Sequence, residues 1–266
     1  MNPWRQWQAL KQNPVYLREK GAWGTPNPFY RQISRFSPFV ILGVIVLGIC
    51  GGSTNPALFA GNDEMLAAAC LICLPGFLIT AVTLYAQILT PALIAPTISM
   101  ERAAGTWDIL RTTPLSMRSI MLAKLFGALS RLRIWPALFA LTLLHGGIMA
   151  CSFSLLGGEN AWWGGVLGVA AAVRPWLEII FAAFVGMYAS TLASSAMMAL
   201  VAAYSAVVLA KIFNSGGLWL MVGFFAELGD TAVLLLTMMG PIIVYLLLIT
   251  AVWLGLFRQA EKLRTE

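Results

Sequence analysis

Six apolar stretches constrain the fold of this 266-residue chain more than any other feature. They cover residues 37–52, 65–91, 134–156, 175–194, 195–213 and 231–257. About 20 apolar residues in a helix cross the hydrocarbon core of a bilayer, and a helix satisfies its own backbone hydrogen bonds there. The chain is 59% hydrophobic and only 11% charged, so it has too few polar side chains to cover a water-soluble fold. The sequence therefore predicts an all-α integral membrane protein with six transmembrane helices.

Lysine and arginine are distributed unevenly between the two sides of such a bundle. All but two of the 17 lie before the first stretch, between the second and third, or after the sixth. The exceptions, Arg174 and Lys211, are expected on the opposite side. Because basic residues are retained in the cytoplasm, we expect both termini there and the chain in the inner membrane of the cell. The net charge of +6 then fits a rim that faces anionic lipid head groups.

Residues 1–36 are expected to form a cytoplasmic segment that ends in an amphipathic helix lying in the membrane interface. Phe29 and Ile33 recur on one face of this helix, whereas Arg31 and Arg35 lie on another. Membrane anchoring and docking of a partner both remain open as its role.

Further segments frame the six-helix domain, which is expected to span residues 37–257. Asn13 is expected to cap a short helix that begins at Pro14. Residues 214–230 are too apolar for a free loop and too short to span, which favours a segment that re-enters the outer leaflet. Residues 258–266 are expected to be a cytoplasmic tail.

The cytoplasmic connection at residues 98–125 has the pattern of short helices joined by corners. Gly105 is suited to end a helix that continues inward from the second stretch, and Thr106 to cap a new helix that ends near Leu110. Pro114 is suited to the first position of another helix, which would run into the third stretch. Short helices of this kind give a soluble partner a rigid surface to push.

This connection resembles the signature of the ABC-2 type permeases, the membrane-spanning subunits of ABC exporters. The matching residues are Glu101, Arg102, Gly105, Thr106, Leu110, Thr113, Pro114, Leu115, Ser116, Lys124 and Leu125. Residues 13–19 are similar to the family's N-terminal segment, and the six-span layout agrees. The turn at 193–196 lacks the basic residue that many members carry between the fourth and fifth spans.

The resemblance implies a dimer, with a second copy or a homologous permease, bound to a separate ABC ATPase subunit. That partner would bind ATP and Mg²⁺. The chain contains no Gly-x-x-x-x-Gly-Lys-Ser/Thr phosphate loop, so we expect it to be no enzyme and to hold no cofactor of its own.

The resemblance also assigns ATPase coupling to the helix that contains Thr106, Trp107, Asp108 and Leu110, and to the flanking residues Glu101, Arg102, Gly105, Thr113 and Pro114. Movement of this helix would tilt the second and third spans around a central pathway. Glu101 and Arg102 are expected to form a charge network with Arg31 and Arg35 of the interfacial helix. The alternative is a solvated Glu101–Arg102 pair that contributes little.

Small residues recur every four positions on one face of the fourth stretch, at Ala182, Gly186 and Ser190. This pattern lets helices approach closely, either within the subunit or across a dimer interface. Glu178 lies on the same face and is a possible pathway residue. The alternative is an acid in the first helical turn after Pro175, where the helix dipole favours it.

Metal or redox chemistry is not expected. His145 is the only histidine and is interpreted as structural, and the four cysteines, which include Cys70 and Cys73, lie in apolar stretches.

The alternative functions are an ATP-independent transporter or channel, or a membrane-embedded enzyme. Because the spans carry almost no charge, the pathway suits a hydrophobic or amphipathic substrate such as a lipid, drug, antibiotic or peptide.

Overall fold

The computed structural model describes residues 3–21, 28–53, 64–156, 162–225 and 230–265, and all regular elements in these ranges are helices. Five helical segments are long and apolar enough to cross a membrane: Leu74–Ala103, Trp135–Ser152, Trp162–Leu192, Ala196–Asn214 and Thr237–Leu263. The first predicted stretch lies in helix α3 (Pro28–Ser53), which is not among these five. The six-span count therefore stays a prediction.

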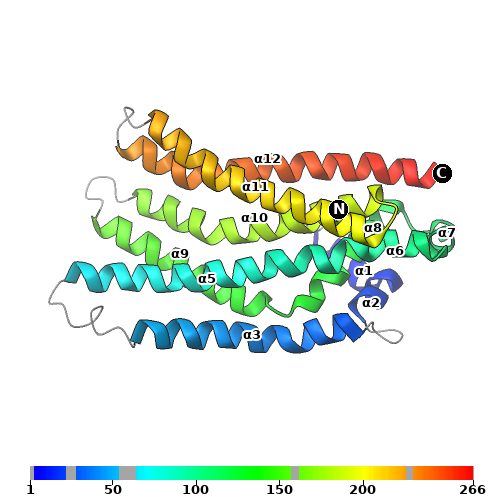
Figure 1. Ribbon diagram of the computed structural model, residues 1–266, viewed down its shortest axis with the longest axis horizontal. Coiled ribbons are helices and arrows are strands. Elements are labelled where there is room, and N and C mark those ends of the chain that lie inside the picture. The colour runs from blue at the N-terminus through cyan, green and yellow to red at the C-terminus, as the bar shows by residue number, and fades with distance from the viewer. Residues whose placement is uncertain (1–2, 22–27, 54–63, 157–161, 226–229, 266) are drawn as a thin grey trace.

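The long helices lie side by side with roughly parallel axes (Figure 1). Besides α3 they are α5 (Glu64–Ile94), α9 (Trp135–Leu156), α10 (Trp162–Leu192), α11 (Ala196–Phe225) and α12 (Asp230–Thr265). Helix α10 contacts α9, α12, α5 and α11, so its side chains form the centre of the bundle. Helix α3 lies at the edge and contacts α5.

Five short helices gather at the end of the bundle where the chain terminates (Figure 1). They are α1 (Pro3–Gln12), α2 (Pro14–Lys20), α6 (Pro96–Ala103), α7 (Thr106–Arg111) and α8 (Met117–Leu129). Most of the lysine and arginine residues lie in these helices or next to them, so we call this end of the molecule the basic end.

Two predicted helix starts have different outcomes. The cap of α2 is confirmed, because the Asn13 side chain accepts a 2.9 Å hydrogen bond from the backbone N–H of Val15. The predicted start at Pro114 is wrong, since α8 begins at Met117. Ser116, rather than Pro114, starts this helix because its hydroxyl accepts a hydrogen bond from the Ser119 N–H.

The predicted corner at Gly105 is confirmed, with one difference at its neighbour. Gly105 has a φ of 68°, a left-handed conformation that costs glycine nothing, and it separates α6 from α7. Gly105 itself occupies the N-cap position of α7, so Thr106 is the first helical residue and not the cap. The Thr106 hydroxyl instead donates to the Glu101 carbonyl at 3.3 Å, across the corner.

Helix α8 does not run into α9 as predicted. A 3₁₀ turn (Ser130–Leu132) and Arg133, with a φ of 48°, interrupt the path. The Ser130 hydroxyl donates to the Gly127 carbonyl at 2.7 Å, and the Trp135 indole donates to the Leu129 carbonyl at 3.1 Å. These bonds satisfy the last carbonyl groups of α8 and so favour a stop there.

The N-terminal interfacial helix is not separate from the first stretch. Helix α3 runs through Pro38 without a break, so Ile33, Arg31 and Arg35 lie on the same helix as the apolar residues that follow. The Ser37 hydroxyl donates to the Leu132 carbonyl at 2.7 Å and joins α3 to the 3₁₀ turn. The Phe29 side chain lies outside the described residues.

Two predicted span boundaries are displaced, although the turn between α10 and α11 at residues 193–195 is confirmed. Helix α10 begins at Trp162, so Pro175 lies inside it and Glu178 is not in a first turn. Helix α11 continues to Phe225, so residues 214–225 extend a helix and form no separate re-entrant element, while 226–229 lie outside the described residues. Apolar residues precede Pro175 as well as follow it, so composition marks no helix start there. Helix α11, in contrast, continues through Asn214, Ser215, Gly216 and Gly217, although glycine disfavours a helix interior.

Candidate functional site

A lysine with no exposed side-chain surface lies at the centre of the basic end. The Lys124 ammonium on α8 lies 3.0 Å from Glu19 Oε1 on α2 and 2.8 Å from Glu101 Oε2 on α6. The contact with Glu19 is a hydrogen bond, and the ammonium also donates to the Thr97 carbonyl at 3.4 Å. One buried cation therefore joins three helices.

Two arginines extend this cluster. Arg18 donates to Glu101 and lies 3.6 Å from Glu19, and Arg131 lies 3.8 Å from the other oxygen of Glu19. We call these residues, with Lys124, the ion network. Both carboxylates are nearly buried, which distinguishes the ion network from the exposed pair of Arg118 and Glu261.

Burial lowers the pKa of Lys124 from 10.5 to about 8, because a charged ammonium loses its hydration there. The attraction and hydrogen bond of Glu19 oppose this effect, while Arg18 and Arg131 add to it. The protonation of Lys124 therefore depends on its burial and on Glu19.

Close packing of α2 on α8 brings Glu19 to Lys124. A Cβ atom on Gly127 would lie 2.6 Å from Glu19 Cβ and 3.1 Å from the Tyr16 carbonyl oxygen, so only glycine fits. The Asn13 amide donates to the Ser119 hydroxyl at 3.1 Å and fixes the other end of α2.

One face of helix α7 packs against the core of the protein, and the opposite face is exposed. Trp107 and Leu110 are buried in the same core cluster as Ile98 and Met117. Ile109, in contrast, is 69% exposed on the side of α7 that no other described element covers. An apolar side chain this exposed at the basic end is available to a partner.

The other predicted coupling residues lie around α7. Arg102 donates to the Thr191 carbonyl at 3.2 Å, which ties the end of α6 to the end of α10. Thr113 donates to the Leu110 carbonyl at 2.7 Å and closes the turn after α7, where Pro114 is exposed. Asp108 is exposed within α7 and interacts with a neighbour.

The partners of Glu101 differ from those predicted. They are Arg18 and Lys124, whereas Arg31 and Arg35 line a separate pocket beside α3. Sequence spacing could not identify Arg18 as a partner because Arg18 and Glu101 are 83 residues apart.

A second charged cluster lies among the long helices. Glu178 accepts hydrogen bonds from Gln87 at 2.8 Å, Lys211 at 2.7 Å and Arg174 at 3.1 Å. Lys211 also donates to the Gln87 side-chain oxygen at 3.2 Å. Arg174 and Lys211 therefore lie on membrane-spanning helices, not in outer loops, because α10 extends well before Pro175.

This cluster forms one wall of a cavity of about 500 Å³ between α5, α9, α10, α11 and α12. Thr80, Thr83 and His145 add polar atoms to the lining, and Ile79 and Met149 add apolar surface. His145 Nδ1 has no hydrogen-bond partner among the described residues. The cavity thus combines charged and apolar groups at the depth of the spans.

The small residues of α10 face α5 and α6. Ala182 is fully buried, and a Cβ atom on Gly186 would lie 3.4 Å from Ile94 Cβ. The Ser190 hydroxyl accepts hydrogen bonds from the backbone N–H groups of Ile98 at 3.0 Å and Ser99 at 3.1 Å. This face therefore makes contacts inside the subunit.

Within the described ranges, no group of three or more His, Cys, Asp or Glu side chains could hold a metal ion. Cys151 is a free, exposed thiol. The side chains of Cys70 and Cys73 lie outside the described residues.

Among the described residues, five helices are long and apolar enough to cross a bilayer, which indicates a multi-pass α-helical membrane protein. Comparisons with protein-family models, with curated proteins and with solved structures found no match for it.

Proposed function

We propose that the chain is the membrane-spanning subunit of an ATP-driven exporter and works as a dimer with a separate ATPase. The proposed orientation places the basic end in the cytoplasm, because positively charged segments are retained there. This orientation puts α7 and α8 where a soluble ATPase can reach them.

The observation that carries this proposal is the attachment of α7 to the spans. Its inner face is anchored by Trp107 and Leu110, and its outer face presents Ile109 to a partner. Glu101 lies on α6, which the corner at Gly105 separates from α7, and its side chain binds Arg18 and Lys124. A displacement of α7 therefore has a direct mechanical route to α2, α6 and α8.

The route continues into the membrane. Helix α6 follows α5 after the single residue Ala95, and Arg102 and Ser190 hold it against α10. In the proposed cycle, closure of the ATPase pair pushes α7 and tilts α5 and α10. The Ser130–Arg133 interruption gives the connection to α9 a bend at which this movement is accommodated.

The cavity beside Glu178 supports an amphipathic cargo. Its apolar lining suits acyl chains or aromatic rings, while Arg174 and Lys211 suit a polar or anionic group. A lipid, antibiotic, drug or peptide with both kinds of surface fits this lining better than a sugar or a metal ion does.

An ATP-independent, ion-coupled transporter is the second candidate, favoured by the Glu178 cluster. Charged side chains within spans often bind the coupling ion or proton in such proteins. This candidate gives no role to the exposed face of α7, so we rank it second.

The test is ATPase activity of the complex isolated in mild detergent through a tag on this subunit. We expect Mg²⁺-dependent ATP hydrolysis in the eluate, stimulated by amphipathic substrates, with stimulation lost in Glu101→Ala. Absence of hydrolysis, together with substrate uptake into protein-containing vesicles under an ion gradient alone, would establish the second candidate.

A further inference from the structure

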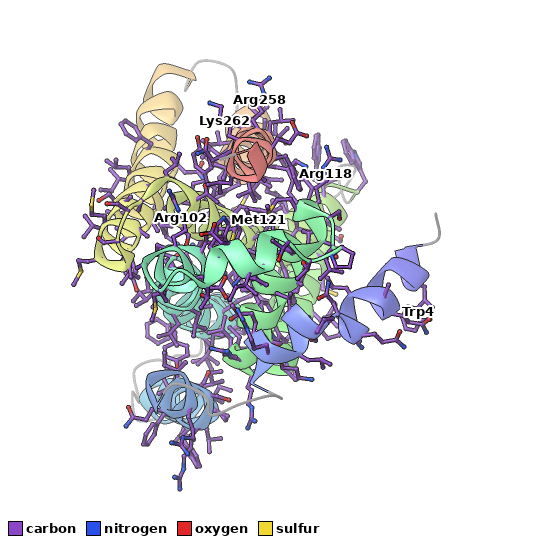
Figure 2. The ribbon with its side chains drawn as sticks, turned by 90° about the vertical axis from the view of Figure 1, so that its right-hand side faces the viewer. Trp4, Arg102, Arg118, Met121, Arg258 and Lys262 are labelled. Carbon is purple, nitrogen blue, oxygen red and sulfur yellow. The ribbon has the colours of Figure 1, made fainter. Side chains whose placement is uncertain are left out.

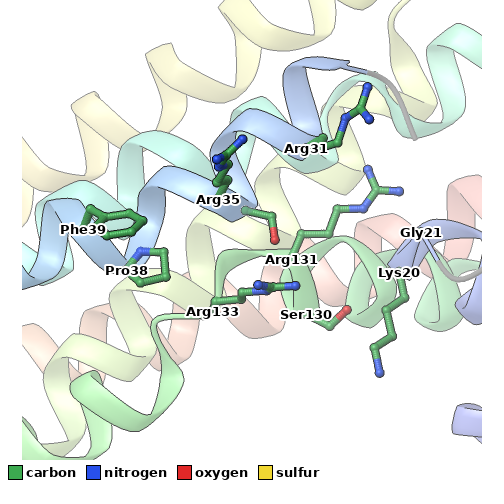
Figure 3. A pocket seen from close by; sticks show the side chains of 10 residues that line it. Lys20, Gly21, Arg31, Arg35, Pro38, Phe39, Ser130, Arg131 and Arg133 are labelled. Carbon is green, nitrogen blue, oxygen red and sulfur yellow. The ribbon is translucent and has the colours of Figure 1, made fainter. Parts of the chain in front are cut away.

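A pocket of about 560 Å³ lies at the basic end between α2, α3 and the connection from α8 to α9 (Figure 3). Its lining contains five cationic side chains, which come from all three sides: Lys20, Arg31, Arg35, Arg131 and Arg133. Figure 3 shows Arg131 and Arg133 extending from the α8–α9 connection below Arg31 and Arg35 of α3.

The positive charge of this pocket is largely unbalanced. Arg31, Arg35 and Arg133 form no ion pair with any carboxylate among the described residues. Glu19 Oε2 lies 3.8 Å from Arg131, and the single negative charge of this carboxylate is shared with Lys124, which lies 3.0 Å from Oε1. Like charges held together repel each other, so the arrangement favours an anion that neutralises several of them at once.

Contacts within the protein hold the backbone segments that carry these arginines. Arg133 adopts a φ of 48°, which is uncommon for a residue with a side chain. The hydrogen bond from Ser37 to the Leu132 carbonyl fixes α3 beside this turn. The two walls of the pocket are therefore joined within the protein itself, and guanidinium groups suit the paired oxygens of a phosphate.

The pocket opens onto apolar surface along α3. Pro38 and Phe39 belong to its lining, and Phe39 is 66% exposed. Val40, Leu42 and Val46 continue this exposed apolar surface toward the middle of the helix. A ligand that fits both parts has a phosphate group and long apolar chains.

We propose that this pocket binds the phosphate head group of an anionic phospholipid, whose acyl chains lie along α3. Basic pockets between helices at a membrane surface have the charge and position for such head groups. The site does not depend on the proposed transport function. It would hold α3 against α2 and the α8–α9 connection through a lipid.

The test is native mass spectrometry of the full-length protein with phosphatidylglycerol, and with phosphatidylcholine as the zwitterionic reference. The test variant combines Arg31→Gln, Arg35→Gln and Arg133→Gln. The matched control, Arg118→Gln, Arg258→Gln and Lys262→Gln, removes equal charge from the same end but far from α3 (Figure 2). A third variant changes Arg31, Arg35 and Arg133 to lysine and so keeps the charge.

We expect the wild type to bind phosphatidylglycerol selectively and the test variant to bind it roughly 100-fold more weakly. The control and the lysine variant should retain most of the binding, and all variants should melt as the wild type does in phosphatidylcholine. Equal loss in the test and control variants, or no loss in the test variant, would overturn the proposal.

Soluble ligands identify the source of the phosphate. Inorganic phosphate and glycerol phosphate should fail to displace phosphatidylglycerol, because they lack the chains that contact α3. Displacement by either one at the concentration of the lipid would overturn the lipid assignment in favour of a soluble phosphate compound.

Discussion

Lys124 Nζ lies 3.0 Å from Glu19 Oε1, and no part of the lysine side chain is exposed. This contact joins α2, the second helix of the chain, to α8, next to α7, the proposed ATPase-contact helix. The closest partners of a buried ammonium determine both the stability of the basic end and its response to pH.

Removal of the Glu19 carboxylate should destabilise the protein strongly. Glu19→Gln leaves the buried Lys124 charge with less compensation, and breaking a buried pair from one side costs about 3–5 kcal/mol. The double variant Glu19→Gln/Lys124→Met should recover most of the loss, as measured by thermal unfolding in detergent. Glu261→Gln, which breaks an exposed pair with Arg118, should cost about 0–1 kcal/mol. Equal destabilisation of the single and double variants would contradict the pairing.

The free energy of unfolding should rise with pH between about 8 and 10.5. In this window folded Lys124 has released its proton while the unfolded chain still binds one, so higher pH favours the folded state. The slope from this group is about 1.4 kcal/mol per pH unit. Melting temperatures measured across the window should show this rise in the wild type and not in Lys124→Met. A rise of the same size in both proteins would exclude Lys124 as its source.

Gly127→Ala should separate α2 from α8. The added methyl group would lie 2.6 Å from Glu19 Cβ, so the helices must move apart, at a cost of about 1–3 kcal/mol. Gly147→Ala is the matched control, because it also lies in a helix but meets nothing within 4 Å. The control should be neutral or slightly stabilising, in line with the higher helix propensity of alanine. Unfolding measurements that rank the two variants in the opposite order would refute the close contact.

Glu178→Gln should destabilise the spans and impair transport. It removes the carboxylate that Arg174 and Lys211 share, and leaves two cations among apolar helices, at a cost of about 3 kcal/mol. The double variant Glu178→Gln/Lys211→Met should regain stability. Transport that remains lost in this stable double variant would place the cluster in the pathway. Normal transport would limit Glu178 to a structural role.

Local features of the sequence predicted local structure well. Asn13 caps α2 and residues 193–195 form the turn between α10 and α11 because each is decided by a few neighbouring residues. The predicted start of the fourth span at Pro175 is wrong, because apolar residues precede Pro175 as well as follow it and α10 begins at Trp162. Composition therefore could not locate the first helical turn.

The charged clusters needed the tertiary structure. The pairing of Lys124 with Glu19 depends on how α2 packs, which no spacing in the sequence specifies. Only one contact of the second cluster had a local signal, since Arg174 and Glu178 are four residues apart and so lie on one face of a helix. Lys211 reaches them from α11 only after the bundle has formed.

The central claim, that α7 contacts an ATPase, is tested most directly by photo-crosslinking from position 109 in cell membranes. The comparison site is position 143, because Leu143 is also exposed but lies within the α9 span. We predict that a photo-reactive residue at 109 captures an ATP-hydrolysing protein in a yield that changes with nucleotide, and that position 143 captures none. The account would be contradicted if position 109 captured no such protein in either nucleotide state.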